Sequence, residues 1–241
     1  MKLFRTLALA AALCACSLPA LANSNFNYEE PRGGAAQFLG KMDHKDSLYY
    51  WHPDFYNRKS SENLLLLEKF KTRQQNTDYT CGPVVAMMVI NYLNPADLEK
   101  ESVIAKKMGA RPGKGTTTKN IVKYFDELGW QVNSSEDGMT PETYDKFLTF
   151  VDRKLRTRTP VMVERMDRAG HWRVIIGHDN MGTAATGDDV LIMADTFDTF
   201  DHLQDGYIIL PAKKFFHMWS NIHNSNRSLG TRQWVTATIP K

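Results

Sequence analysis

Cysteine is scarce in this chain of 241 residues, which contains three. Cys14 and Cys16 lie in an apolar leader, so Cys81 is the single thiol that we expect in the folded protein. A lone cysteine excludes a disulfide framework, and the hydrophobic core must therefore hold the fold by itself. An unpaired thiol is either a small buried core residue or a nucleophile. For a cysteine taken alone, the buried interpretation is the commoner one.

Long apolar runs are also missing, since beyond the leader no stretch of about 18 apolar residues could span a bilayer. The leader has Lys2 and Arg5, a short apolar run at 7–15, and small residues at 20–22 before Asn23. This order is typical of a secretory signal peptide over residues 1–22. We therefore expect a periplasmic or secreted protein.

A second interpretation of the leader is a lipoprotein signal at residues 13–16, with Cys16 acylated. Cys14 is an unusual residue just inside such a site, and the signal-peptide interpretation is preferred. In both cases Cys14 and Cys16 lie outside the folded domain, and Cys81 stays unpaired.

A strong excess of charge of either sign is absent as well. Removal of Lys2 and Arg5 with the leader leaves 28 basic residues against 27 acidic ones. This balance argues against nucleic acid or a charged membrane surface as a partner. A hydrophobic content of 42% is enough for a core. The length fits one domain with an extension, which we expect to be a monomer.

The chain divides into an irregular arm rich in aromatic residues, at 23–61, and a regular domain at 62–241. The helices that we expect are listed by range: 62–70, 81–93, 95–108, 118–128, 140–156 and 211–221. The expected strands are 161–163, 172–177, 190–194, 207–210 and 233–239. Helices first and an antiparallel sheet later predict an α+β fold, with a helical half packed on the sheet.

The segment that follows Cys81 predicts the chemistry of this thiol. Apolar residues recur at intervals of three or four from Val84 to Tyr92, which predicts a helix with one buried face and Cys81 at its amino terminus. The partial positive charge there favours a thiolate, and the free N–H groups can bind an oxyanion. Gln75 is the natural side-chain donor to the same oxyanion, and Gln74 is the fallback.

A thiolate also needs a base and a group that orients it. His171 has the best context among the histidines, because it follows Gly170 and opens the strand HWRVIIGHD. His178 should face the opposite side of that strand. Asp195 ends the apolar strand VLIMAD and is the candidate orienting residue. For Asp195 taken alone, a turn or capping role would be the preferred interpretation.

The combination of QQNTDYTCGPVVAMMVINYL, GHWRVIIGHDN and a strand ending in Asp resembles the bacteriocin-processing cysteine peptidases, family 39 of the papain-like clan, and their stand-alone secreted relatives. The resemblance covers about residues 70–239. It implies a papain-like fold, a peptide or protein substrate and no cofactor or metal. It also implies that Cys81 is the nucleophile, His171 the base, Asp195 the orienting residue and Gln75 the oxyanion donor.

One departure from that family and one further resemblance leave alternatives open. Many members have Asp-Pro at the third position, whereas Thr196 follows Asp195 here, so Asp198 is retained as a second candidate. The stretch from Met88 to Leu93 is similar to phytochelatin synthases, which implies γ-glutamyl transfer on thiol peptides as a variant of the same chemistry.

A non-catalytic module on the same fold is the other class of function. The run DTFDTFDH offers Asp195, Asp198, Asp201 and His202 as oxygen and nitrogen ligands for Ca²⁺. Its three-residue spacing and the lack of an EF-hand glycine favour a solvated acidic loop. The loop RPGKGTTT at 111–118 lacks the spacing of a phosphate-binding loop, which argues against a nucleotide.

Overall fold

The computed structural model describes residues 29, 32–40, 48–49, 53–165, 170–199, 203–219 and 232–240. The expected signal peptide at 1–22, with Cys14 and Cys16, lies outside the described residues, as does part of the arm. Within the described ranges, no helix is long and apolar enough to cross a membrane.

The described part of the chain contains a sheet of seven strands, and every pairing in it is antiparallel. The order across the sheet is β2-β7-β3-β4-β5-β6, and β1 pairs with β4. The strands are β1 (Leu64–Leu66), β2 (Gln131–Ser134), β3 (Val161–Arg165), β4 (His171–Asp179), β5 (Val190–Asp195), β6 (Tyr207–Pro211) and β7 (Trp234–Thr238).

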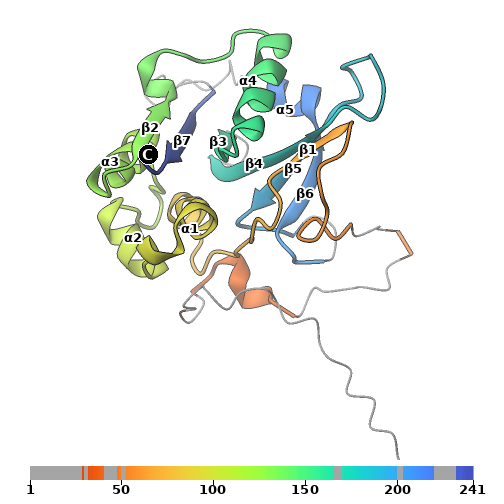
Figure 1. Ribbon diagram of the computed structural model, residues 1–241. Helices are drawn as coiled ribbons and strands as arrows, with labels where there is room; N and C mark the ends of the chain where they lie inside the picture. The colour runs from red at the N-terminus through yellow and green to blue at the C-terminus, as the bar shows by residue number, and fades with distance from the viewer. Residues whose placement is uncertain are drawn as a thin grey trace, which may run out of the picture.

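Helices pack around this sheet (Figure 1). The helices α1, α2 and α3 lie together at one side of β4, whereas α4 packs on β4 and β1 and contacts α5. Their bounds are α1 (Cys81–Leu93), α2 (Glu101–Lys107), α3 (Thr118–Glu127), α4 (Tyr144–Arg156) and α5 (Ala212–Trp219), with short 3₁₀ helices η1 (Ala35–Phe38), η2 (Pro95–Asp97) and η3 (Ser135–Asp137). The α+β fold predicted from the sequence is confirmed.

The helix that carries Cys81 is more deeply buried than its sequence predicted. Every residue from Cys81 to Asn91 is buried, because α1 passes between the sheet and the pair α2 and α3. A helix that is apolar all round belongs inside a core. The expected single buried face was therefore wrong, and this helix is the centre of the hydrophobic core.

Three other expectations about elements were wrong. The range 62–70 forms the strand β1 rather than a helix, because Leu64–Leu66 pairs with residues 177–179 of β4. The range 95–108 divides into η2 and α2. The helix expected from residue 140 begins at Tyr144, where the Thr143 side chain accepts a hydrogen bond from the Lys146 N–H.

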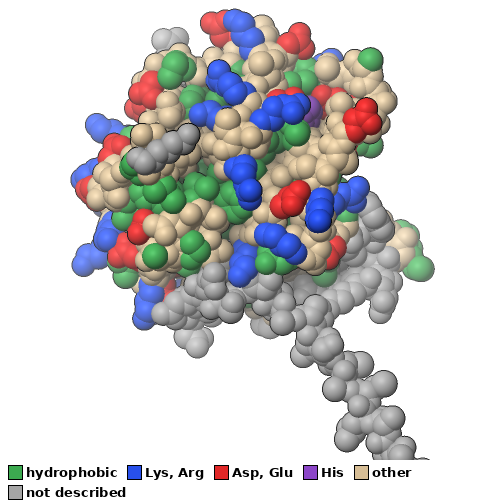
Figure 2. Space-filling model, in the orientation of Figure 1, with side chains coloured by type: hydrophobic (Ala, Val, Ile, Leu, Met, Phe, Trp, Pro, Cys, Tyr) green, Lys and Arg blue, Asp and Glu red, His purple; other side chains and the backbone are tan. Residues whose placement is uncertain are grey.

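The surface is consistent with the near balance of charges in the sequence. Figure 2 shows basic and acidic side chains interspersed over the visible face of the molecule, without a continuous patch of one sign. This face provides no broad attraction for a polyanion.

His178 links α4 to the sheet through two carboxylates. Its Nδ1 lies 2.6 Å from an oxygen of Asp152 in α4, and its Nε2 lies 3.0 Å from an oxygen of Asp189, just before β5. The residue is 6% exposed. Burial would lower the pKa of His178, but the hydrogen bonds and negative charges of Asp152 and Asp189 raise it above its usual value.

This arrangement predicts a pH-dependent contribution to stability. Because the pKa of His178 is raised in the folded state, the contribution is complete below the unfolded-state pKa of about 6.5 and is lost as pH rises through the folded-state pKa. We expect His178→Asn to lower the free energy of unfolding by about 2 kcal/mol at pH 6, as for hydrogen bonds to charged groups. Urea unfolding from pH 6 to 10 should show this difference shrinking with pH, and parallel profiles would contradict it.

Candidate active site

Cys81 occupies the first residue of α1. The Thr80 hydroxyl donates to Glu101 at 2.6 Å, and within the described residues the Thr80 side chain does not cap the helix. Pro83 has no N–H, so the backbone N–H groups of Cys81 and Gly82 are the donors at the helix start. Cys81 is 8% exposed, which leaves its sulfur at the edge of the core.

Glu101, at the start of α2, holds the turn that precedes Cys81. Its carboxylate accepts hydrogen bonds from the Asn76 N–H at 2.9 Å and from the Thr80 hydroxyl. It also forms a buried ion pair with Arg73 at 3.4 Å. Burial raises the pKa of Glu101 although these contacts act in the opposite direction. The turn is thus fixed by charge-assisted hydrogen bonds.

The first turn of α1 is also packed tightly against Thr116, a loop residue that binds the strand carrying His171. A Cβ on Gly82 would lie 2.7 Å from the Cβ of Thr116, a contact too close for any side chain. The Thr116 carbonyl accepts a hydrogen bond from the Trp172 indole at 3.0 Å, and Trp172 is the neighbour of His171 in β4. These contacts set the distance between the cysteine and the histidine.

His171 lies beside a carboxylate and near a thiol. Its Nε2 is 2.6 Å from Oδ1 of Asp195, and the Cys81 side chain is near enough to contribute to the raised pKa of the ring. Since Nε2 faces Asp195, Nδ1 is the ring nitrogen that can exchange a proton with Cys81. The structure thus brings together the three residues predicted as nucleophile, base and orienting group.

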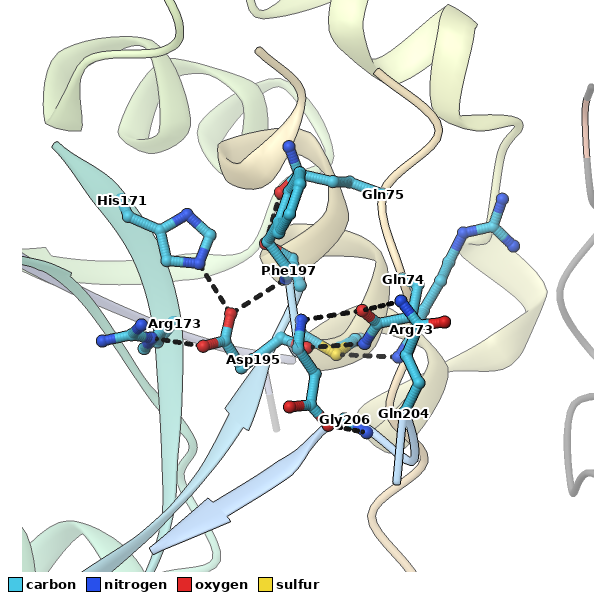
Figure 3. A network of polar contacts seen from close by, with 12 residues as sticks. Arg73, Gln74, Gln75, His171, Arg173, Asp195, Phe197, Gln204 and Gly206 are labelled. Carbon is cyan, nitrogen blue, oxygen red and sulfur yellow. Dashed lines mark hydrogen bonds and ion pairs between the residues drawn. The ribbon is translucent and has the colours of Figure 1, made fainter. Parts of the chain in front are cut away.

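Asp195 is held from several directions, as Figure 3 shows. Its Oδ1 accepts from His171 and from the Phe197 N–H at 2.9 Å, and its Oδ2 accepts from Nε of Arg173 at 2.7 Å. Arg173 and Asp195 are direct neighbours across β4 and β5. The 2% exposed carboxylate is therefore satisfied at both oxygens.

The charges of this cluster raise the pKa of His171 and lower the pKa of Asp195, which favours a charged pair of these two residues. Burial would lower the pKa of His171, but the Asp195 carboxylate and the hydrogen bonds with Asp195 and Cys81 raise it to about 9. Burial acts to raise the pKa of Asp195, but the positive charges of His171 and Arg173 hold it far below its usual range. An imidazolium at neutral pH is a suitable partner for a thiolate.

Gln75 lies in the segment that leads into the Cys81 turn. Its Nε2 donates to the Thr77 carbonyl at 2.7 Å, and its Oε1 accepts from the Thr196 hydroxyl at 2.7 Å. The backbone N–H of Gln75 donates to the Thr196 carbonyl at 2.8 Å. The residue after Asp195 therefore positions the predicted oxyanion donor.

Gln74 and Asp198, the two fallback candidates, bind each other instead. The Gln74 Oε1 accepts from the Asp198 N–H at 2.8 Å, and its Nε2 donates to the Asp195 carbonyl at 2.9 Å. Oδ2 of Asp198 accepts from the Gly206 N–H at 2.8 Å. Both residues support the loop that follows Asp195. Asp195 rather than Asp198 meets His171.

The same contacts concern the alternative that the run DTFDTFDH binds Ca²⁺. Asp195 and Asp198 are bound to protein donors, and Asp201 and His202 lie outside the described residues. In the ranges that the structure describes, no group of three or more His, Cys, Asp or Glu side chains is arranged to hold a metal ion.

Sequence reasoning missed three residues that shape this site. Arg173 follows His171 by two positions, so strand alternation could have placed it on the same face. Thr196 and Glu101 left no such signal, because their roles depend on contacts with Gln75 and Thr80 that are remote in sequence.

Comparisons with known proteins bear on this geometry. Residues 67–226 match the model of a family described as the Peptidase_C39 like family. A search of curated proteins gave no match. Among solved structures, the chain is similar to the peptidase domain of Streptococcus ComA, a bi-functional ABC transporter involved in a quorum sensing pathway, with a TM-score of 0.48 and 15% identity over 71% of this chain and 99% of that one.

Two further solved structures are of the peptidase domain of Streptococcus mutans ComA. The complex with a small-molecule inhibitor gives a TM-score of 0.40 and 16% identity over 71% of this chain and 100% of that one. The domain alone gives a TM-score of 0.38 and 16% identity over 70% of this chain and 99% of that one.

The ion-pair geometry predicts how His171 titrates. We expect its ring to lose a proton near pH 9, since the pKa of His171 is raised to about 9 by Asp195 and Cys81 against the effect of burial. Asp195→Asn removes the carboxylate and should lower this pKa. NMR titration of the ring measures both values. Asp152→Asn, which changes the partner of His178 instead, is the matched control, and an equal shift in both variants would refute the assignment.

Proposed function

We propose that this chain, which belongs to the Peptidase_C39-like family, is a cysteine peptidase that uses Cys81 as its nucleophile, His171 as its base and Asp195 to orient the imidazole. The family match covers more than half of the chain and includes all three residues. The observation that carries the assignment is the hydrogen bond between the His171 ring and the Asp195 carboxylate, beside a Cys81 side chain that contributes to the raised pKa of His171.

The first half of the reaction forms an acyl-enzyme. The Cys81 thiolate attacks the carbonyl carbon of a peptide bond, and the carbonyl electrons move to its oxygen. The Cys81 N–H and the remaining N–H of the Gln75 amide donate to this oxyanion. As the tetrahedral intermediate collapses, Nδ1 of His171 gives its proton to the leaving amine, and a thioester remains on Cys81.

The second half releases the acyl group. His171, now neutral, takes a proton from a water molecule as this water attacks the thioester carbon. Collapse of the second intermediate frees the carboxylic acid and restores the Cys81 thiolate beside a protonated His171. Throughout both halves Asp195 holds the ring by Nε2, so that Nδ1 stays directed at the sulfur.

The leader supports a proposed location for this reaction. The pattern of Lys2, Arg5, an apolar run and small residues at 20–22 favours export, with the substrate met in the periplasm or outside the cell. Peptides or proteins are the substrate class that the chemistry favours. Transfer of the acyl group to an amine, as in phytochelatin synthases, would use the same thioester with a different acceptor.

Replacement of the nucleophile tests the proposed chemistry. We expect Cys81→Ala to remove all cleavage of a peptide library, because no acyl-enzyme can form, and to remove alkylation by iodoacetamide near neutral pH. Mass spectrometry of the products identifies the cleaved bonds and separates hydrolysed from transferred acyl groups. Thermal unfolding should show that the variant is folded, and cleavage that continues in a folded Cys81→Ala protein would refute the proposal.

The proposed role of Gln75 as oxyanion donor has a separate test. Gln75→Ala removes one donor to the tetrahedral intermediate, and we expect kcat to fall by about 10²–10³. Alkylation of Cys81 passes through no oxyanion, so its rate should stay close to that of the wild type. Gln75→Glu, which keeps the shape but replaces the N–H donors by acceptors, should behave like Gln75→Ala. An unchanged kcat in both variants would exclude Gln75 from this role.

A further inference from the structure

An amino-terminal segment outside the family match packs on the residues that carry Gln75. The match begins at residue 67, whereas residues 32–36, here called the clamp segment, lie against residues 75–77. Figure 1 shows η1, which begins within this segment, beside the chain that leads into α1. We propose that the clamp segment is a positioning element for Gln75, a role that rests on the proposed function.

Backbone hydrogen bonds join the two segments. The N–H groups of Arg32 and Gly34 donate to the Asn76 carbonyl, the second at 3.0 Å, and the N–H of Ala36 donates to the Gln75 carbonyl at 2.9 Å. Arg32 and Gly33 both form bridges with Thr77. The clamp segment therefore holds the backbone from the Gln75 carbonyl to Thr77.

Gly34 allows the two backbones to meet at this distance. Its φ of −87° is open to any residue, so its backbone conformation does not require glycine. The requirement is space, because a Cβ at this position would overlap with the Gln75 oxygen and with backbone atoms of Asn76 and Thr77. Ala35 and Ala36, which follow, are 0% and 5% exposed. The small residues at 34–36 thus allow the clamp segment to pack closely against residues 75–77.

The opposite side of Gln75 is held by the loop after Asp195. The Gln75 N–H donates to the Thr196 carbonyl, and the Thr196 hydroxyl donates to the Gln75 side chain. The side chain of Gln204 donates to the Ala35 carbonyl at 2.8 Å and approaches Gln74 at 3.5 Å. Residues 74–77 are therefore enclosed between the clamp segment and the loop that begins at Asp195.

A contact at the start of the arm adds a separate anchor. Oε2 of Glu29 accepts a hydrogen bond from the Ser102 N–H, at the first turn of α2, at 2.8 Å. Glu29 binds the start of α2 and not Gln75, so a change at Glu29 weakens the attachment of the arm without removing a hydrogen-bond partner of Gln75. Such a residue provides a mild second test.

The clamp segment affects the position of one hydrogen-bond donor, the Gln75 side chain. Residues 71–75 form neither helix nor strand in the structure, so Gln75 has no regular element of its own to hold it. Misplacement of a catalytic donor by about 1 Å costs up to about 10²-fold in rate. A clamp on the backbone of Gln75 and Asn76 removes this freedom before the substrate arrives.

Gly34→Ala is the direct test. The added methyl should displace the clamp segment, and we expect kcat to fall about tenfold, a part of the loss for a missing oxyanion donor, with little change in KM or in the alkylation rate of Cys81. Gln37→Ala, at an exposed position of the same η1 helix, is the control that should keep the wild-type kcat. In a Gln75→Ala background, Gly34→Ala should have no further effect on kcat.

Several outcomes would overturn the proposal. A higher kcat in Gly34→Ala would mean that the arm covers the site, and an equal further loss in the Gln75→Ala background would mean that the clamp acts elsewhere. If Gly34→Ala does not fold, Glu29→Ala should show a smaller loss of kcat in the same direction, and an unchanged kcat in that variant would refute the clamp.

Hydrogen exchange separates a failure of the clamp from a failure of the proposed function. Wild-type protein without Cys81-dependent cleavage would refute the peptidase assignment alone. Exchange of the Gln75 and Thr77 amides requires no substrate and should be faster in Gly34→Ala, and to a lesser degree in Glu29→Ala, than in Gln37→Ala or the wild type. Equal exchange in all four proteins would refute the clamp whatever the activity.

Discussion

The buried carboxylate of Asp195 is the interaction on which the site depends. An ionised carboxylate inside a protein requires partners, and Asp195 has two cationic ones, His171 and Arg173. Their roles differ, because a guanidinium stays charged at any ordinary pH whereas an imidazole gains and loses its proton. Arg173 therefore keeps the carboxylate ionised at each stage of the proposed cycle. His171 can then pass a proton to the leaving amine without leaving an unpaired charge in the core.

The end of β5 positions the proposed oxyanion donor as well as the proposed base. The Asp195 side chain fixes His171, while the next residue, Thr196, binds both the backbone and the side chain of Gln75. The position of the proposed nucleophile depends on a different group, because Glu101 holds the turn before Cys81. The relative placement of base and oxyanion donor is thus carried by two adjacent residues. The distance from the thiol depends on how α1 packs against β4.

Much of the fold could be predicted from the sequence, because periodicity and turn residues mark α3, α4 and most strands. The strand β1 could not, since a short run of leucines suits a helix or a strand until its partner in β4 is known. The strand β2 was missed because its polar residues are largely exposed. Cys81, His171 and Asp195 were predicted from their local sequence contexts and from the resemblance to a family. Thr196 and Glu101 could not be found, because their contacts join segments that are remote in sequence.

The three proposed catalytic elements differ in how rigidly the fold holds them. Cys81 begins a helix that is buried from Cys81 to Asn91, and His171 begins a strand paired on both sides, so both inherit the order of the core. Gln75 lies on an irregular segment, whose backbone groups are satisfied by Thr196 on one side and by residues 34–36 on the other. A donor must be preorganised before charge develops, because ordering it during the reaction would raise the barrier. The irregular segment that carries Gln75 thus needs support from other parts of the chain. The clamp segment, which lies outside the family match, is placed to supply this support.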